Sequence, residues 1–157
     1  MIRRAYLMFF AALLVSLVLV LDALASGPRL SHARYQSMLT RADAQVSRVE
    51  TAAEHGLTPK ATLAQAKTLL LAWARTETRL GKSFRAVSPP SDAARANALL
   101  WQGEVMFGAE LASAADHLPQ KKAQVRSFLQ QRLGTARGAR KIDAALALLK
   151  KAGYGGG

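Results

Sequence analysis

Helical periodicity is clearest in residues 63–87, which read LAQAKTLLLAWARTETRLGKSFRAV. Apolar side chains recur here at alternating steps of three and four residues, which lays one stripe along a helix. The stripe consists of Leu63, Ala66, Leu70, Trp73, Glu77, Leu80, Phe84 and Val87. Glu77 is its one charged member. Because the spacing follows heptads throughout the segment, it predicts a long helix packed against other helices.

A shorter stripe precedes this helix and extends from Tyr35 to Ala53. Gly56 is expected to end the first helix, because glycine accepts the left-handed geometry just past a helix C-terminus. Thr58 and Pro59 are then expected to begin the second helix, as its cap and its first-turn residue.

Two prolines, Pro89 and Pro90, end the second helix because proline cannot continue one. Ser91 or Asp92 is expected to cap a third helix that runs to about His117. The apolar stripe of this third helix includes Gly103, which would let a neighbouring backbone approach closely.

The composition changes after Pro119. Residues 26–118 hold eleven Lys/Arg against eight Asp/Glu, whereas residues 119–157 hold nine against one. Two shorter amphipathic segments lie in this basic part, separated by a flexible stretch from Gly134 to Gly138. The sequence therefore predicts an all-α fold, an antiparallel up-down helical bundle of three long helices with one or two short basic C-terminal helices.

A chain of 157 residues is expected to form one folded domain. Its expected parts are residues 1–25 as a hydrophobic leader, 26–118 as the core of the bundle, 119–152 as the basic C-terminal helices, and 153–157 as a disordered glycine-rich tail.

The leader predicts export from the cytoplasm. Two arginines precede an uncharged and almost wholly apolar run over residues 5–21. Ala23 and Ala25 supply the small-x-small pattern that a signal peptidase needs, with cleavage before Ser26. The alternative is an uncleaved anchor, because residues 5–21 reach the lower limit of about 17 apolar residues for crossing a bilayer. In both cases the rest of the chain is expected outside the cytoplasm, either periplasmic or secreted.

No pattern of residues specifies an enzyme. Cysteine is absent, and no Glu is followed three residues later by His, as a carboxylate-bridged di-metal site would require. Residues 76–83 end like a phosphate-binding loop, but they lack its first glycine and lie within the periodic helix. We therefore expect a non-enzymatic protein with no catalytic residue, no metal site and no cofactor.

Glu77 and Glu104 are expected to lie side by side. If the second and third helices pair antiparallel about the Pro-Pro turn, residues equidistant from position 90 meet, and these two are 13 and 14 positions away. Two carboxylates that share a site could do acid/base work, or each could pair with an arginine such as Arg75, Arg79 or Arg95. The ion pairs are the favoured expectation.

The basic residues of the C-terminal part form the expected functional surface. Interleaved with apolar stripes, they make a basic amphipathic pattern that would bind an anionic membrane surface, an envelope polymer or an acidic protein partner. They are Lys121, Lys122, Arg126, Arg132, Arg137, Arg140, Lys141, Lys150 and Lys151. Nucleic acid is not an expected partner, because the sequence has no recognition motif for it.

A second hypothesis is an extracytoplasmic carrier of small ligands. Its pocket would lie between the helices and would be lined by Trp73, Phe84, Trp101 and Phe107. Aromatic residues at helical spacing also serve as ordinary core. The basic surface is therefore the leading hypothesis and the carrier is its alternative.

Overall fold

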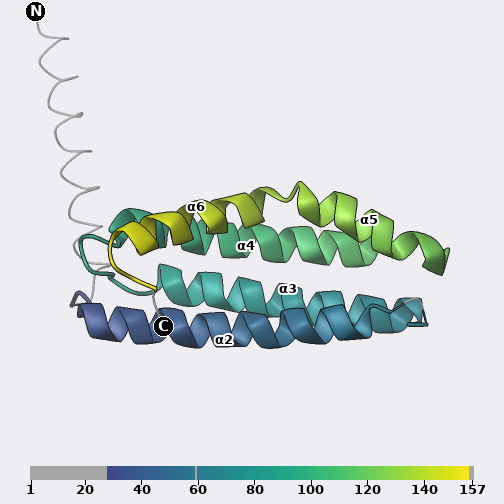
Figure 1. Cartoon of the computed structure of the whole chain (residues 1–157), viewed down its shortest axis with the longest axis horizontal. Coiled ribbons are helices and arrows are strands. Elements are labelled where there is room, and N and C mark those ends of the chain that lie inside the picture. Colours follow the sequence, from purple (N-terminus) through teal and green to yellow (C-terminus); the bar gives the residue numbers. More distant parts are fainter. Residues whose placement is uncertain (1–27, 59, 156–157) are drawn as a thin grey trace, which may run out of the picture.

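The computed structural model describes residues 28–58 and 60–155, and within these ranges the fold is all-α, with five helices and no strand (Figure 1). The helices are α2 (His32–Gly56), α3 (Leu63–Arg85), α4 (Ala94–Asp116), α5 (Lys122–Gly134) and α6 (Arg137–Lys151). The predicted helical bundle is confirmed.

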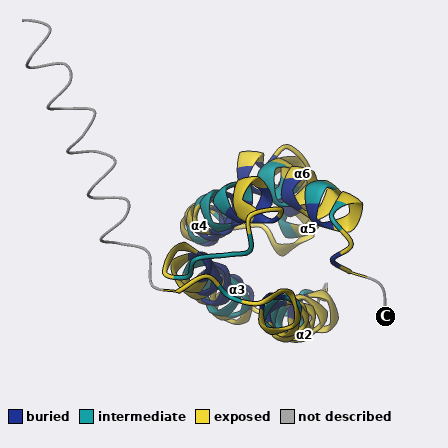
Figure 2. Ribbon diagram, turned by 90° about the vertical axis from the view of Figure 1, so that its left-hand side faces the viewer, coloured by how far each residue is buried: buried dark blue, intermediate teal, exposed yellow. Residues whose placement is uncertain are grey.

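The helices form two layers. α2 and α3 lie antiparallel in one layer, and α4 lies in the other with α5 and α6 placed end to end along it (Figure 1). The end-on view shows buried residues on the helix faces that point toward the middle of the bundle (Figure 2). α6 contributes Ala145 and Leu149 to the same core cluster as Leu80 of α3 and Leu100 of α4. The basic C-terminal helix is therefore a wall of the bundle.

Two helix starts differ from the prediction. α3 begins four residues later than expected, at Leu63, because Thr62 and Gln65 form a capping box in which each side chain bonds the other residue's backbone N–H. Neither Ser91 nor Asp92 caps α4; its N-cap is Ala93, which makes no side-chain bond to the helix. The Asp92 carboxylate instead accepts a hydrogen bond from the Tyr154 hydroxyl.

A buried polar contact joins the first helix to the third. The Tyr35 hydroxyl, which is fully buried, donates a 2.9 Å hydrogen bond to the side-chain oxygen of Asn97. The Asn97 amide in turn donates to the carbonyl of Phe84 at 3.0 Å. A buried amide is tolerated in a core only when it is paired, and this pairing fixes α2 and α3 against the start of α4.

The stretch between the two C-terminal helices is shorter than predicted. α5 ends at Gly134 and α6 begins at Arg137, so Gly138 lies buried inside a helix rather than in a flexible linker. A Cβ at Gly138 would meet the backbone of Phe107, with the Phe107 Cα only 2.6 Å away. On α4, the predicted close approach at Gly103 is confirmed, since a Cβ there would lie 2.9 Å from the backbone N of Ile142.

The start of α6 is capped from another helix. The carboxylate of Glu110 on α4 accepts hydrogen bonds from the backbone N–H groups of Arg137 at 2.8 Å and of Gly138 at 3.1 Å. A carboxylate at this position satisfies donors that the helix leaves free and interacts favourably with its dipole. Together with the glycine contacts, it holds α6 tightly along α4.

Residues 153–155, expected to belong to a disordered tail, pack against the bundle. The Tyr154 side chain is buried, and the Gly155 N–H donates to the side-chain oxygen of Gln36 on α2. Gly153 and Gly155 have φ values of 84° and 90°, a region that favours glycine, so the chain can turn back over the end of the bundle.

The predicted leader, its arginines and its cleavage residues Ala23, Ala25 and Ser26 lie outside the described residues. Among the helices of residues 28–58 and 60–155, none is both long enough and apolar enough to cross a membrane.

Candidate functional site

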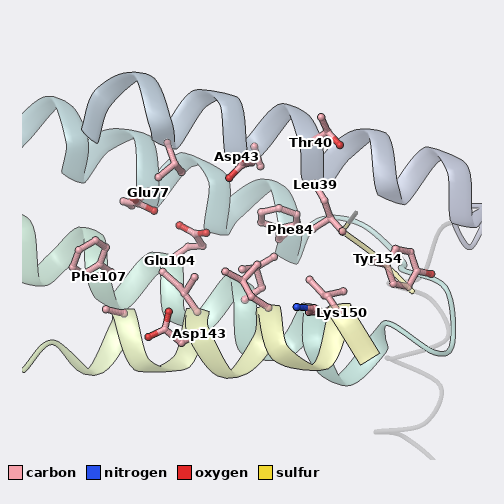
Figure 3. A pocket seen from close by; sticks show the side chains of 18 of the residues that line it. Leu39, Thr40, Asp43, Glu77, Phe84, Glu104, Phe107, Asp143, Lys150 and Tyr154 are labelled. Carbon is pink, nitrogen blue, oxygen red and sulfur yellow. The ribbon is translucent and has the colours of Figure 1, made fainter. Parts of the chain in front are cut away.

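A cavity of about 710 Å³ lies between α2, α3, α4 and α6. Its size falls within the range of roughly 300–1,000 Å³ that is usual for small-ligand pockets. The apolar stripe of α2 forms one wall, through Leu39, Ala42 and Val46, and Ile142 and Leu149 of α6 form the facing one. All five belong to one hydrophobic cluster of the bundle and also line the cavity, where Figure 3 labels Leu39.

Glu77 and Glu104 meet in this cavity, as the antiparallel register of their helices predicts. Their carboxyl groups point toward one another from α3 and α4 (Figure 3). Their side chains are 2% and 5% exposed, and Oε2 of each has no hydrogen-bond partner among the described residues. From outside the pair, the indole N–H of Trp73 donates a 2.6 Å hydrogen bond to Oε1 of Glu77.

The favoured expectation of ion pairs at these two glutamates is wrong. Arg75 and Arg79 lie two residues before and after Glu77, and residues two apart in a helix do not share a face. Arg79 instead donates to the side-chain oxygen of Gln45 on α2. The ion pair found among the described residues joins Lys67 and Asp116 at the surface.

Burial raises the pKa of Glu104 to about 10, and the hydrogen bond and the charge of Glu77 add to the effect. Glu104 therefore holds a proton at pH 7. That proton gives its carboxyl a donor toward Glu77, which a pair of ionised carboxylates would lack. The pair thus carries one proton more than two ordinary glutamates would carry at this pH.

Three of the four predicted aromatic residues line the cavity, and one does not. Trp73, Phe84 and Phe107 face it, and the rings of Trp73 and Phe107 meet edge to face with centroids 5.6 Å apart. Trp101 is not among the lining residues and lies beneath the guanidinium of Arg85, 5.2 Å from its ring centre. Tyr154, and not Trp101, is therefore the fourth aromatic residue that lines the pocket between the helices.

Sequence reasoning missed three further carboxylates in the cavity, Asp43 and Glu50 on α2 and Asp143 on α6. Burial raises the pKa of Glu50, with Glu54, Glu77 and Asp43 adding to the effect through their charges. A signal existed for each residue. Asp43 and Glu50 are seven residues apart and therefore share one helix face, and Asp143 is the single acid among residues 119–157.

The residues of the predicted basic surface lie on α5, on α6 and just before α5, in the layer that these helices form with α4. Of its nine side chains, eight are exposed and Lys141 is half-buried, where it donates a 2.7 Å hydrogen bond to Gln102. Lys150 also lines one end of the cavity. None of the nine takes part in an ion pair with another described residue.

The cavity combines a buried carboxyl pair with aromatic and apolar side chains. No group of three or more metal-ligating side chains in the described ranges is placed to hold a metal ion. Residues 76–83 lie within α3, so they form no phosphate-binding loop. Comparison with protein-family models, with curated proteins and with solved structures found no match to this chain, so the geometry of the cavity is the basis for inferring its function.

Proposed function

We propose that this protein binds a small organic molecule in the cavity between α2, α3, α4 and α6. The observation that carries the proposal is the pair of buried carboxyl groups, because beyond the proton that Glu104 shares with Glu77, Oε2 of neither residue has a hydrogen-bond partner among the described residues. An unpaired buried acceptor costs roughly 1–3 kcal/mol. Apolar residues at these two positions would make the core more stable. A ligand with hydrogen-bond donors, in contrast, could bond both carboxyl groups.

The aromatic lining supports the same reading. Trp73, Phe84 and Phe107 supply rigid surface at a low cost in conformational entropy, as ligand sites commonly do. The half-buried stripe of α2 adds an apolar wall that a ligand could cover. The function is therefore that of a carrier or sensor of small molecules.

The test is a thermal-shift screen against small cationic, neutral and anionic organic compounds, followed by calorimetry on the compounds that raise the melting temperature. Ala139→Leu places a larger side chain at the cavity wall, and Ala147→Leu makes the same change on the exposed face of the same helix. We expect Ala139→Leu to abolish the shift and Ala147→Leu to keep it. A screen without a hit, or a shift that Ala139→Leu leaves intact, would contradict the proposal.

A second function is supported by the state of the nine basic side chains. Eight of them are exposed and none is neutralised by an ion pair with another described residue, so their charge is available to an anionic partner. We propose that this surface holds the protein at an anionic membrane or envelope polymer, gaining about 1 kcal/mol per basic residue near the surface.

Sedimentation with phosphatidylglycerol vesicles and with phosphatidylcholine vesicles tests this surface. Replacing Lys121, Lys122 and Arg126 by Gln should weaken binding to the anionic vesicles, and added salt should weaken it further. Replacing Arg34, Arg41 and Arg48 of α2 by Gln removes the same charge elsewhere and should weaken binding less. Equal losses in the two triple variants would show that net charge alone is responsible.

We also propose that the chain is exported by its leader, either with cleavage after Ala25 or with residues 5–21 kept as an anchor. The support is the pattern of charged, apolar and small residues in the leader. The mass of the protein recovered from cells distinguishes the two forms. Recovery of the full-length chain from the cytosol would contradict export.

A further inference from the structure

The charged residues that line the cavity are mainly acidic, whereas the protein as a whole is basic. The whole chain has 22 Lys/Arg against ten Asp/Glu, yet five of the ten acids line this one cavity, with Lys150 as the single basic residue beside them. The five are Asp43, Glu50, Glu77, Glu104 and Asp143. A cavity with this lining selects against anions and favours a cation.

The deepest acids are arranged to receive an ammonium group. The indole N–H of Trp73 occupies Oε1 of Glu77, and apart from the proton shared within the pair, Oε2 of Glu77 and Oε2 of Glu104 have no hydrogen-bond partner among the described residues. An ammonium has three donors and no acceptor, so it can satisfy both oxygens at once. The neighbouring rings of Trp73 and Phe107 add a surface that attracts cations.

Of the other three acids, Glu50 lies near enough to this pair for the charge of Glu77 to raise its pKa. Asp43 projects from α2 and Asp143 from α6, and both are exposed (Figure 3). Within the described ranges, the acids are not gathered closely enough for three of them to hold one metal ion. A ligand that engages both groups of acids must therefore carry separated charges, joined by a chain that packs against Leu39, Phe84 and Ile142.

We propose that the cavity binds an aliphatic diamine, with one ammonium on the Glu77–Glu104 pair and the other between Asp43 and Asp143. This inference rests on the proposed small-molecule function and names its ligand class.

Binding should be coupled to the release of a proton. The proton that the raised pKa keeps on Glu104 is replaced by the ammonium, so Glu104–COOH and R–NH₃⁺ become Glu104–COO⁻ paired with R–NH₃⁺, and H⁺ leaves to solvent. The titratable groups that share the cavity with Glu104 are Glu77 from α3, Asp43 and Glu50 from α2, Asp143 and Lys150 from α6, and Tyr154. Among them, Glu77 is the one that contacts Glu104 directly.

The experiment is calorimetric titration at pH 7 with three probes of equal chain length: hexamethylenediamine, hexylamine and hexanol. We expect the diamine to bind more tightly than the monoamine and the monoamine more tightly than the alcohol, with roughly tenfold between steps, because each charged hydrogen-bonding group adds about that much. Titration of the diamine in two buffers of different ionisation enthalpy should show proton release.

Matched variants assign the two ends of the ligand. Glu104→Gln should remove the proton release and weaken both amines roughly tenfold, whereas Asp143→Asn, at an exposed position, should weaken the diamine and leave hexylamine unchanged. Glu54→Gln removes an acid of α2 that does not line the cavity and should change neither.

The outcomes separate this inference from the function beneath it. Two results would overturn the proposal that the ligand is a diamine and would leave small-molecule binding intact. One is that hexanol binds as tightly as the amines, and the other is that none of the three probes binds although the screen has found other ligands. If hexylamine equals the diamine, or Glu104→Gln leaves proton release intact, the placement of the ammonium groups is overturned. If no compound of any class binds, both fail.

Discussion

The hydroxyl of Tyr154 donates a 3.0 Å hydrogen bond to the carboxylate of Asp92, which joins the end of the chain to the turn between α3 and α4. The same ring stacks on His32 with centroids 4.0 Å apart and meets the ring of Tyr35 edge to face. Burial, and next the hydrogen bond to Asp92, raise the pKa of Tyr154, so the hydroxyl is a donor throughout the neutral range.

The first prediction concerns this contact. Tyr154→Ala should destabilise the fold by about 3–5 kcal/mol, the usual cost of removing a buried aromatic ring. Tyr154→Phe removes the hydroxyl alone and should cost about 1 kcal/mol. Urea unfolding followed by circular dichroism measures both. An unchanged midpoint for Tyr154→Ala would mean that the C-terminal segment does not pack on the bundle in solution.

The second prediction concerns the contact between α4 and α6. Gly138→Ala would place a Cβ against the backbone of Phe107, where no flexible side chain can move aside. We expect a loss of about 1–3 kcal/mol from overpacking, which exceeds the gain of up to about 1 kcal/mol in helix propensity. Gly134→Ala is the control, since no atom lies within 4 Å of its Cβ position. It should be neutral or stabilising, and equal effects at the two glycines would contradict the packing argument.

The third prediction concerns the buried polar contact. Asn97→Ala leaves both the Tyr35 hydroxyl and the Phe84 carbonyl without their partner and should cost about 2–4 kcal/mol, because two hydrogen bonds are lost in the core. Tyr35→Phe removes one of these bonds and should cost about half as much. A double variant that is no less stable than Asn97→Ala alone would confirm that the two residues act as a unit. Full additivity would argue against it.

The fourth prediction concerns pH. The pKa of Glu104 is about 10 in the fold and near 4.5 in the unfolded chain, so the folded state binds the extra proton between these values. Its contribution to stability is complete below about pH 4.5 and is lost as the pH rises toward 10, at no more than about 1.4 kcal/mol per pH unit. Melting temperatures measured from pH 5 to pH 9 should fall in the wild type and change less in Glu104→Gln. A profile that Glu104→Gln does not flatten would place the titrating group elsewhere.

The helices could be predicted because their signal is periodic and local. The stripe of α3 and the prolines that follow its end at Arg85 set both the helix and the antiparallel return of α4, and this register alone brings Glu77 to Glu104. Helix starts were less predictable, since Thr58 and Thr62 both suit a cap. The reciprocal bond from Gln65 decides between them.

The remainder of the site depends on rotations of helices that a linear pattern does not specify. Trp101 and Phe107 lie on the same helix, yet their side chains face different neighbours. Gly138 looked like a linker because glycine is common in loops, whereas here it permits a close helix contact. Tyr154 was missed because its glycine neighbours suggest a frayed end, although the same glycines allow the chain to turn back.

The gathering of carboxylates in one hollow of a chain with a formal net charge of +12 has a kinetic consequence. A cation approaching from afar meets a repulsive field, and it meets attraction only within the last few ångströms. Because mobile ions shorten the reach of the first field to about 8 Å at physiological ionic strength, added electrolyte should speed the arrival of a cation while loosening its final hold. The association rate of the cation would then rise with salt concentration, whereas its residence time in the cavity would fall.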